Sequence, residues 1–234
     1  MVSMSTLLMV ALSTLGNAAP LVPRVDCATG SGVYIIEARG TYEGNPGKID
    51  QVATLIKGKY PGSVVASVNY PASAGLFFDP GYNQSVSAGV NDTKSKIADY
   101  VSSCGAKSRI VLLGFSQGGN VMTDTLAGGP GKPARLAETY RANIAGVAVF
   151  GDPTFTKKQT FNGGTSTKSG IFVRSGGSLT NLKTYAKVVR SYCDENDEFC
   201  STDSDKQGPS NSVHNNEVPG HADEATAFIA SLLG

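Results

Sequence analysis

The sequence has little that would support metal, nucleic-acid or membrane binding. It contains only two histidines in 234 residues and no C-x-x-C motif, so the ligand spacing of a zinc site is missing. The formal net charge is only +1, which gives no electrostatic support for binding nucleic acid or an anionic membrane. No apolar run approaches the roughly 20 residues that span a bilayer. Tryptophan is absent, but that excludes nothing at this length.

The N-terminal region is typical of a secreted protein. Residues 7–12 form a short apolar core, and the small residues Gly16, Ala18 and Ala19 follow it. This pattern predicts a signal peptide over residues 1–18, cleaved after Ala18, although its first residues lack Lys and Arg. We then expect a flexible segment over 19–26, a single domain over 27–234 and an extracellular location.

Four cysteines fit a secreted protein with two disulfides. Three pairings are possible. Cys193 and Cys200 are close in sequence and are expected to close their own loop, which leaves Cys27 to pair with Cys104. The sequence also contains two N-glycosylation sequons, whose occupancy it leaves open; they begin at Asn83 and Asn91.

Apolar runs alternate with segments of helical periodicity along the chain. The runs predict strands over 33–38, 63–70, 109–115 and 144–150, with shorter candidates at 171–174 and 186–192. The periodic segments predict helices over 46–59, 82–103 and 222–233. Buried strands separated by helices indicate an α/β fold, a three-layer α/β/α sandwich with a central, mainly parallel sheet of about five strands.

The pentapeptide Gly114-Phe115-Ser116-Gln117-Gly118 is the most informative motif. A G-x-S-x-G match can arise by chance in a chain with 28 glycines, but this one lies between a predicted strand and a predicted helix. Strand, G-x-S-x-G and helix are typical of a nucleophile elbow, in which a tight turn presents the serine hydroxyl. Ser116 is therefore the candidate nucleophile.

A serine nucleophile needs a base and a carboxylate that orients the base. The base is His214 or His221, because both follow Ser116 in the order of an α/β-hydrolase triad. His214 lies in a predicted polar loop, whereas His221 precedes the closing helix and is favoured as a residue at its start. The candidates for the acid are Asp194, Glu195, Asp197 and Glu198 within the Cys193–Cys200 segment, and Asp152 after the strand at 144–150.

The reaction also needs two hydrogen-bond donors for the developing oxyanion. The backbone N–H of Gln117, the residue after the serine, supplies one in an elbow. The second is expected from the segment Ala38-Arg39-Gly40-Thr41 after the first strand, where Thr41 is the candidate.

Several motifs in order resemble the cutinase and acetylxylan esterase family of secreted fungal serine esterases. They are Ala38-Arg39-Gly40-Thr41, Asn69-Tyr70-Pro71-Ala72, Gly114 to Gly119, Gly151-Asp152-Pro153, Tyr192-Cys193 with Asp197 and Cys200, and a late histidine. The resemblance covers roughly residues 27–233. It implies a cutinase-like α/β-hydrolase fold without a lid and the disulfides Cys27–Cys104 and Cys193–Cys200.

The same resemblance selects Asp197 as the acid, His214 as the base and Thr41 as the second oxyanion donor. It implies a monomeric serine esterase that forms an acyl-enzyme and needs no metal or cofactor.

The substrate stays open between several hypotheses. The segment Leu76-Phe77-Phe78 could form an apolar loop that binds acyl chains, as expected for a cutinase acting on aliphatic polyesters. The segments 151–153 and 191–193 instead resemble acetylxylan esterases, which act on an acetylated polysaccharide. A further hypothesis is a catalytically inactive secreted effector or binding protein, and a serine peptidase shares the triad chemistry.

Overall fold

One parallel sheet forms the centre of the protein. The structure, a computed structural model, describes residues 25–75, 80–203 and 211–234. Within these ranges six strands are all parallel, in the order β2-β1-β3-β4-β6-β5. Their bounds are β1 (Tyr34–Ala38), β2 (Val64–Ser67), β3 (Ile110–Phe115), β4 (Ile144–Phe150), β5 (Asn162–Gly163) and β6 (Val189–Tyr192).

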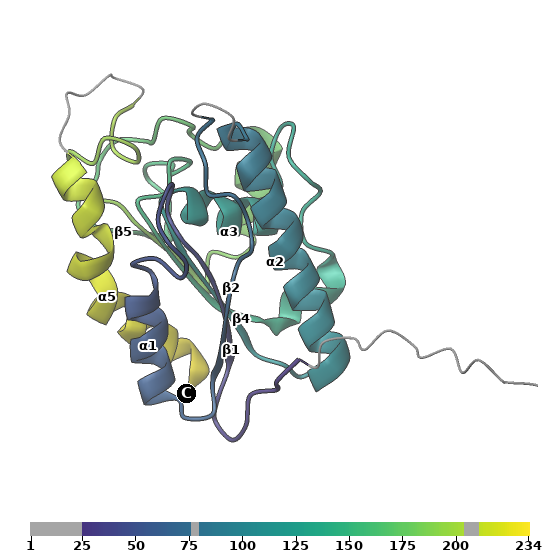
Figure 1. Cartoon of the computed structure of the whole chain (residues 1–234). Helices are drawn as coiled ribbons and strands as arrows, with labels where there is room; N and C mark the ends of the chain where they lie inside the picture. Colours follow the sequence, from purple (N-terminus) through teal and green to yellow (C-terminus); the bar gives the residue numbers. More distant parts are fainter. Residues whose placement is uncertain (1–24, 76–79, 204–210) are drawn as a thin grey trace, which may run out of the picture.

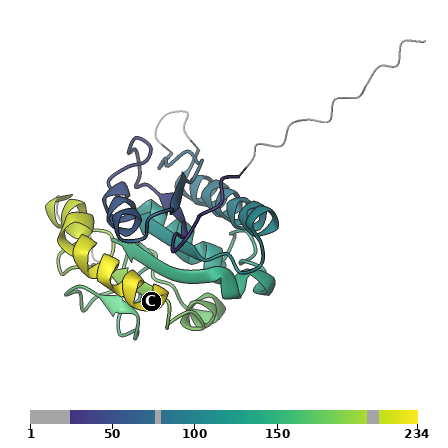
Figure 2. The ribbon, with the colours of Figure 1, turned by 90° about the horizontal axis from the view of Figure 1, so that it is seen from below.

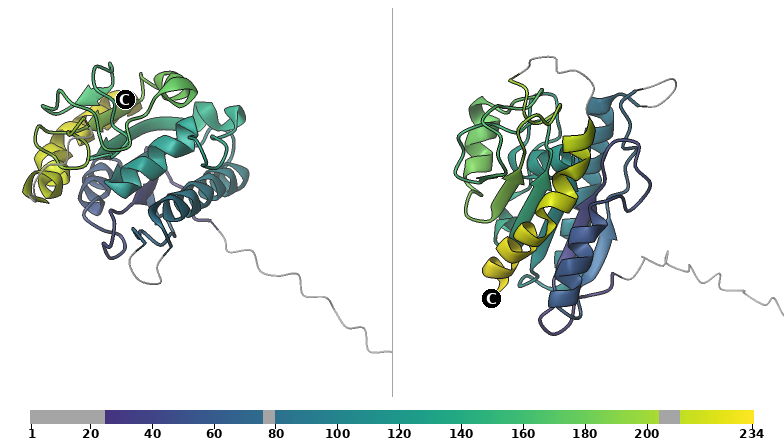
Figure 3. Two further views of the ribbon diagram at one scale, coloured as in Figure 1. Left: turned by 90° about the horizontal axis from the view of Figure 1, so that it is seen from above. Right: turned by 90° about the vertical axis from the view of Figure 1, so that its left-hand side faces the viewer.

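Helices cover both faces of this sheet. On one face α1 (Asp50–Lys59) packs beside α5 (Asn211–Leu233), and on the other α3 (Gln117–Ala127) lies between α2 (Tyr82–Cys104) and α4 (Gly176–Lys183). Figures 1 and 2 show the sheet between these two layers, and the right-hand view of Figure 3 looks onto α1 and α5. A short 3₁₀ helix, η1 (Glu138–Asn143), leads into β4.

The central strands β3 and β4 consist of apolar residues and glycine because both of their faces are buried. In β3, Ile110 and Leu112 pack toward α2 and α3, whereas Val111 and Leu113 pack toward α1 and α5. All four of these side chains have no exposed surface. Successive residues of a strand point to opposite faces, so a strand covered on both sides needs a continuous apolar run rather than alternation.

The predicted three-layer sandwich is confirmed, with two corrections to its strands. The sheet has six strands instead of about five, because the two-residue strand β5 pairs with the edge of β6. The strand predicted at 171–174 is wrong: the N–H groups of Ile171 and Phe172 bond to the carbonyls of Phe199 and Pro153, in a loop outside the sheet.

The closing helix begins earlier than predicted. Helix α5 starts at Asn211 rather than Ala222, so His214 lies in a helix instead of a loop and His221 lies within the helix instead of at its start. Pro219 is inside α5 although it removes one backbone donor. Val218 and Ala222 are buried on either side of it, so packing against the sheet outweighs the local preference.

Both predicted disulfides are present. Cys27 bonds to Cys104 and Cys193 to Cys200, with Cα atoms 5.5 Å and 6.0 Å apart. Among the described residues, no helix has the length and apolar character needed to cross a membrane. The predicted signal peptide over 1–18 and the segment Leu76-Phe77-Phe78 lie outside the described residues.

Candidate active site

Ser116 lies at the carboxyl end of β3, in a strained turn before α3. Its backbone φ of 54° and ψ of −118° are rare for a residue with a side chain. Its N–H still bonds to the carbonyl of Phe150 on β4, 2.8 Å away, so the turn is fixed to the sheet. A Cβ atom at Gly114 would collide with the backbone of Gly118, and a Cβ atom at Gly118 would collide with the backbone of Ala38, so both positions of the motif need glycine.

A hydrogen-bonded chain runs from Ser116 through His214 to Asp197. The Oγ atom of Ser116 is 2.8 Å from Nε2 of His214, and Nδ1 of His214 is 2.7 Å from Oδ2 of Asp197. The three side chains come from the elbow, the first turns of α5 and the Cys193–Cys200 loop. Ser116 is 8% exposed, His214 5% and Asp197 0%, so the serine and the histidine border the cleft while the aspartate is fully buried.

Asp197 remains ionised although it is buried. Burial raises its pKa, but the hydrogen bond and charge of His214 and two backbone N–H groups outweigh this effect, so the pKa lies below its ordinary value. Those N–H groups belong to Phe199 and Cys200, 2.7 Å and 2.9 Å from Oδ1. The disulfide loop thus supplies both the carboxylate and the donors that hold it.

Two aromatic rings hold the imidazole of His214. Phe115 and Phe199 lie with ring centroids 4.9 Å and 4.6 Å from it. Gly151 lies against the same ring: a Cβ atom there would be 2.7 Å from Cε1 of His214 and 2.9 Å from Nδ1. The absence of a side chain at Gly151 is therefore a condition for the observed position of His214.

Thr41 lies beside Ser116 in the same cleft, and the side chain of Gln117 contacts it. Nε2 of Gln117 donates to Oγ1 of Thr41 at 3.2 Å and to the carbonyl of Ser73 at 3.0 Å, and Oε1 accepts from Ser85 at 2.7 Å. The backbone N–H of Gln117 belongs to the first turn of α3, where N–H groups have no intrahelical acceptor. The N–H of Gln117 therefore has no acceptor within α3, and the hydroxyl of Thr41 is held beside Ser116 by the Gln117 side chain.

The other candidate acids and the second histidine lie in separate contacts. His221 is 3.0 Å from Oδ2 of Asp194 and stacks on Tyr192, with centroids 5.0 Å apart. Asp152 is buried and accepts hydrogen bonds from Thr123 and Thr154. Neither the His221 pair nor Asp152 contacts Ser116.

Among the described residues, two groups of side chains near the Cys193–Cys200 loop have the spacing of metal ligands. One of them includes the two cysteines of the disulfide, which are not free to bind a metal, and the other consists of Asp194, Glu217 and His221. Donor atoms of Asp194, Glu217 and His221 lie within 4.8 Å of one another. Asp194 and His221 already pair with each other, and Oε1 of Glu217 accepts the N–H of Asp194 at 2.7 Å. These contacts account for the cluster as a link between the loop and α5, so we assign it no metal.

The cleft above Ser116 has a volume of about 590 Å³ and is largely apolar. Its apolar lining is formed by Tyr42, Ala74, Tyr82, Phe115, Pro153, Ile171, Phe172 and Phe199. Tyr42 and Phe172 are each half exposed at its rim. Such a mixture of apolar walls and few polar groups suits a small organic group.

Sequence reasoning missed most of these lining residues. Phe199 could have been found, because it lies between Asp197 and Cys200 in the loop that was singled out. The sequence predicts Phe172 in a strand and Tyr82 at the start of a helix, and neither prediction points to a cleft. No local pattern brings these two together, since 90 residues of chain separate them.

Comparisons with known proteins agree with this geometry. Residues 29–233 match the family model described as Cutinase. The chain is 31% identical to acetylxylan esterase 2 of Talaromyces purpureogenus, over 96% of this chain and 97% of that protein. It is 28% identical to cutinase 11 of Verticillium dahliae, over 97% and 76% respectively. The solved catalytic core domain of acetyl xylan esterase from Trichoderma reesei superposes with a TM-score of 0.77 and 27% identity, covering 88% of this chain and 99% of that one.

Proposed function

Since this chain belongs to the cutinase family and is a serine esterase, we propose that Ser116, His214 and Asp197 are its catalytic triad. The observation that carries the proposal is the continuous contact from Ser116 Oγ to His214 Nε2 at 2.8 Å and from His214 Nδ1 to Asp197 at 2.7 Å. The strained backbone of Ser116 supports it, because such strain concentrates at functional sites.

The proposed reaction proceeds through an acyl-enzyme. His214 Nε2 takes the hydroxyl proton of Ser116 as Oγ forms a bond to the ester carbonyl carbon. The tetrahedral intermediate then expels the alcohol, which takes that proton from His214. Water attacks the acyl-enzyme, gives its proton to His214, and the acid leaves as Ser116 recovers its proton. Asp197 keeps the Nδ1 proton in place and stabilises the imidazolium.

Thr41 and the N–H of Gln117 are the proposed oxyanion donors. The hydroxyl oxygen of Thr41 already accepts a hydrogen bond from Gln117 Nε2. Its own proton therefore points elsewhere and is available to the cleft. Donors fixed before the reaction stabilise the charge that develops on the carbonyl oxygen.

Reaction of Ser116 with an active-site probe tests the triad. A fluorophosphonate should label the wild-type protein and fail to label Ser116→Ala, with the two proteins equally folded by circular dichroism. Equal labelling of both proteins contradicts the assignment of Ser116. No labelling and no ester hydrolysis by a folded wild-type protein would support the inactive effector or binding protein instead.

The substrate class has two candidates. An aliphatic polyester is supported by the apolar cleft and its half-exposed rings Tyr42 and Phe172. Removal of acetyl groups from a polysaccharide is supported by the similarity to acetylxylan esterases along nearly the whole chain. A panel of p-nitrophenyl esters separates them: cleavage of C8 or longer acyl chains contradicts a strict deacetylase, and cleavage of C2 alone contradicts a cutinase.

We also propose that residues 1–18 are a signal peptide and 27–234 one secreted, monomeric catalytic domain. The two disulfides support an oxidising compartment, and the family match over 29–233 supports a single domain. N-terminal sequencing of the protein from the medium of a fungal host should give Ala19, and light scattering should give the monomer mass. A retained N-terminus or a dimer mass contradicts the respective proposal.

A further inference from the structure

A second cavity lies next to the cleft of Ser116. It has a volume of about 280 Å³, and Tyr82 and Phe172 line both the cavity and the cleft. Their rings contact each other with centroids 5.2 Å apart, so they form the wall between the two spaces. Asn120 lines the second cavity, and its N–H bonds to the carbonyl of Ser116 at 3.1 Å. The second cavity therefore begins about one helical turn, or roughly 6 Å, from the nucleophile.

This cavity presents polar side chains with spare hydrogen-bonding capacity. Asn120 is only 2% exposed, and its Nδ2 has no hydrogen-bond partner among the described residues. Its Oδ1 accepts from the hydroxyl of Tyr82 at 3.3 Å. The half-buried Lys132 bonds to Oδ1 of Asn83 at 2.7 Å, and an ammonium group has three donors. An unpartnered buried donor is costly, and a ligand with acceptor groups relieves that cost.

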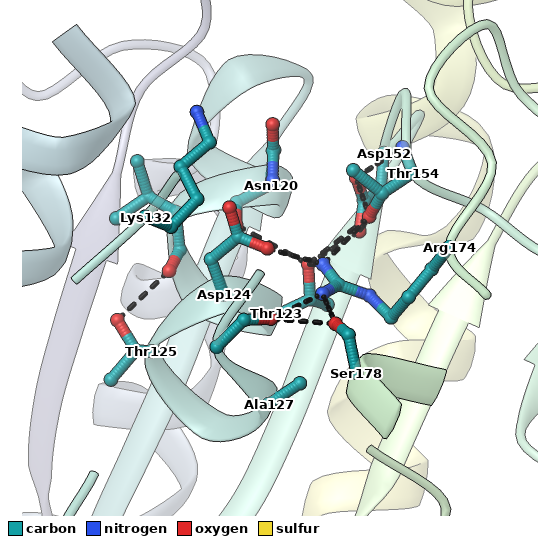
Figure 4. Close-up of polar contacts among 12 residues, drawn as sticks. Asn120, Thr123, Asp124, Thr125, Ala127, Lys132, Asp152, Thr154, Arg174 and Ser178 are labelled. Atoms are coloured by element: carbon teal, nitrogen blue, oxygen red, sulfur yellow. Dashed lines mark hydrogen bonds and ion pairs between the residues drawn. The ribbon is translucent and has the colours of Figure 1, made fainter. Parts of the chain in front are cut away.

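The floor of the cavity is held rigidly. Asp124 and Arg174 form a buried ion pair at 2.7 Å, with side chains 4% and 3% exposed. The same guanidinium donates to the hydroxyls of Thr154 and Ser178 at 3.0 Å and 2.6 Å. Figure 4 shows Arg174 directed toward α3, with Thr154 and Ser178 beside its guanidinium. Because these groups are fixed by one another, a ligand need not order them on binding.

The chemistry of the lining selects among ligands. An acyl chain would leave Asn120 Nδ2 without a partner and would displace water from the Lys132 ammonium group, so the cavity disfavours it. An anion would lie against the carboxylate of Asp124, whose own cation, Arg174, is already bonded. A neutral sugar ring fits both features: its hydroxyls donate and accept, and its C–H face can lie on the half-exposed ring of Phe172.

We propose that this cavity is a subsite for a sugar residue of the substrate, adjacent to the residue that carries the scissile ester. The subsite consists of Tyr82, Asn120, Asp124, Lys132 and Phe172. This inference rests on the esterase function proposed for Ser116 and names its substrate class, an O-acylated polysaccharide. An ester carbonyl at Ser116 and a neighbouring ring beyond the Tyr82–Phe172 wall would occupy both spaces together.

Kinetics on two substrates test the subsite. Lys132→Ala and Asn120→Ala should each raise KM for an acetylated xylan oligosaccharide about tenfold, which corresponds to the loss of one or two hydrogen bonds. Turnover of p-nitrophenyl acetate, which has no sugar, should stay within about twofold, as should the kcat on the oligosaccharide. Lys183→Ala, an exposed lysine at the end of α4, is the matched control and should change neither substrate.

Binding without turnover gives a second measurement. A deacetylated xylan oligosaccharide should bind Ser116→Ala in calorimetry, and adding Lys132→Ala should weaken the Kd about tenfold. The subsite is overturned if the variants impair both substrates equally, if neither affects the oligosaccharide, or if the oligosaccharide does not bind. The esterase function fails separately, if the wild-type protein hydrolyses neither substrate.

Discussion

The side-chain amide of Gln117 donates a hydrogen bond to the hydroxyl of Thr41, with Nε2 and Oγ1 3.2 Å apart. Gln117 is completely buried, and its amide oxygen is held by Ser85 at 2.7 Å. The residue that supplies one proposed oxyanion donor through its backbone therefore orients the other donor through its side chain.

Removal of the Thr41 hydroxyl tests this arrangement. Thr41→Val keeps the shape of the side chain but removes the donor, so we expect kcat for p-nitrophenyl acetate to fall by about 10²-fold with little change in KM. Thr41→Ser retains the hydroxyl and should keep most of the activity. A kcat for Thr41→Val close to that of the wild type would show that Thr41 does not bind the oxyanion.

Gly151→Ala should displace His214 without unfolding the protein. The added methyl group would lie 2.7 Å from the imidazole, so kcat should fall by at least tenfold through the altered position of the base. Gly30→Ala is the matched control, because Gly30 has φ +59° against +58° at Gly151 but no neighbour within 4 Å. Both variants should lose the stability that an alanine at positive φ costs, and Gly151→Ala should lose somewhat more because of the clash. Equal kcat values for the two variants would contradict the steric explanation.

Removal of each disulfide should affect the free energy of unfolding and the kcat to different extents. Replacing both Cys27 and Cys104 by Ser opens a loop of 77 residues and should cost about 4–5 kcal/mol in the free energy of unfolding, whereas kcat stays near the wild-type value. Replacing both Cys193 and Cys200 opens a loop of only 7 residues and should cost about 2–3 kcal/mol.

The second replacement should nevertheless reduce kcat strongly, because the short loop supplies Asp197 and the Cys200 N–H that bonds to it at 2.9 Å. Urea unfolding and p-nitrophenyl acetate turnover measure the two effects. A Cys193/Cys200 variant with full kcat would mean that hydrogen bonding alone holds the carboxylate in place.

Glu217 should make stability dependent on pH. Burial, together with the charge of Asp197, raises the pKa of Glu217 to about 9, against 4.5 for an ordinary glutamate, although the N–H of Asp194 opposes the shift. Between these two values the folded state binds more protons than the unfolded state. The free energy of unfolding should therefore decrease as the pH rises from about 4.5 to about 9.

Glu217→Gln removes the ionisation and should flatten this decrease, so that the variant gains Tm relative to the wild type at pH 8 but not at pH 5. Calorimetry at both pH values measures the difference. Asp223→Asn, at an exposed position on the same helix, should leave the slope unchanged. A Tm difference for Glu217→Gln that is the same at both pH values contradicts the prediction.

Local sequence predicted the strands β1, β3 and β4 well because each is a short apolar run buried on both faces. It failed at 171–174, where an equally apolar run forms the rim of the cleft and leaves Phe172 half exposed. It also failed at the start of α5, because Pro219 and Gly220 disfavour a helix locally while packing against the sheet favours it. Composition does not distinguish an apolar segment that lines a cleft from one that fills a core.

The order of apolar runs and helical segments predicted the parallel α/β architecture and the elbow at Ser116, because each strand, each helix and the G-x-S-x-G turn has a local sequence signal. It left two histidines and five carboxylates open until the family resemblance selected His214 and Asp197. His214 and His221 are seven residues apart on α5. In an ideal helix their side chains point in nearly the same direction, about 20° apart, and their positions along the helix axis are about 10 Å apart. The packing of α5 against the sheet places His214 beside Ser116 and His221 beside Asp194, and the sequence pattern does not reveal this difference. The cavity behind Tyr82 and Phe172 likewise exists only where two distant segments meet, and no local pattern encodes it.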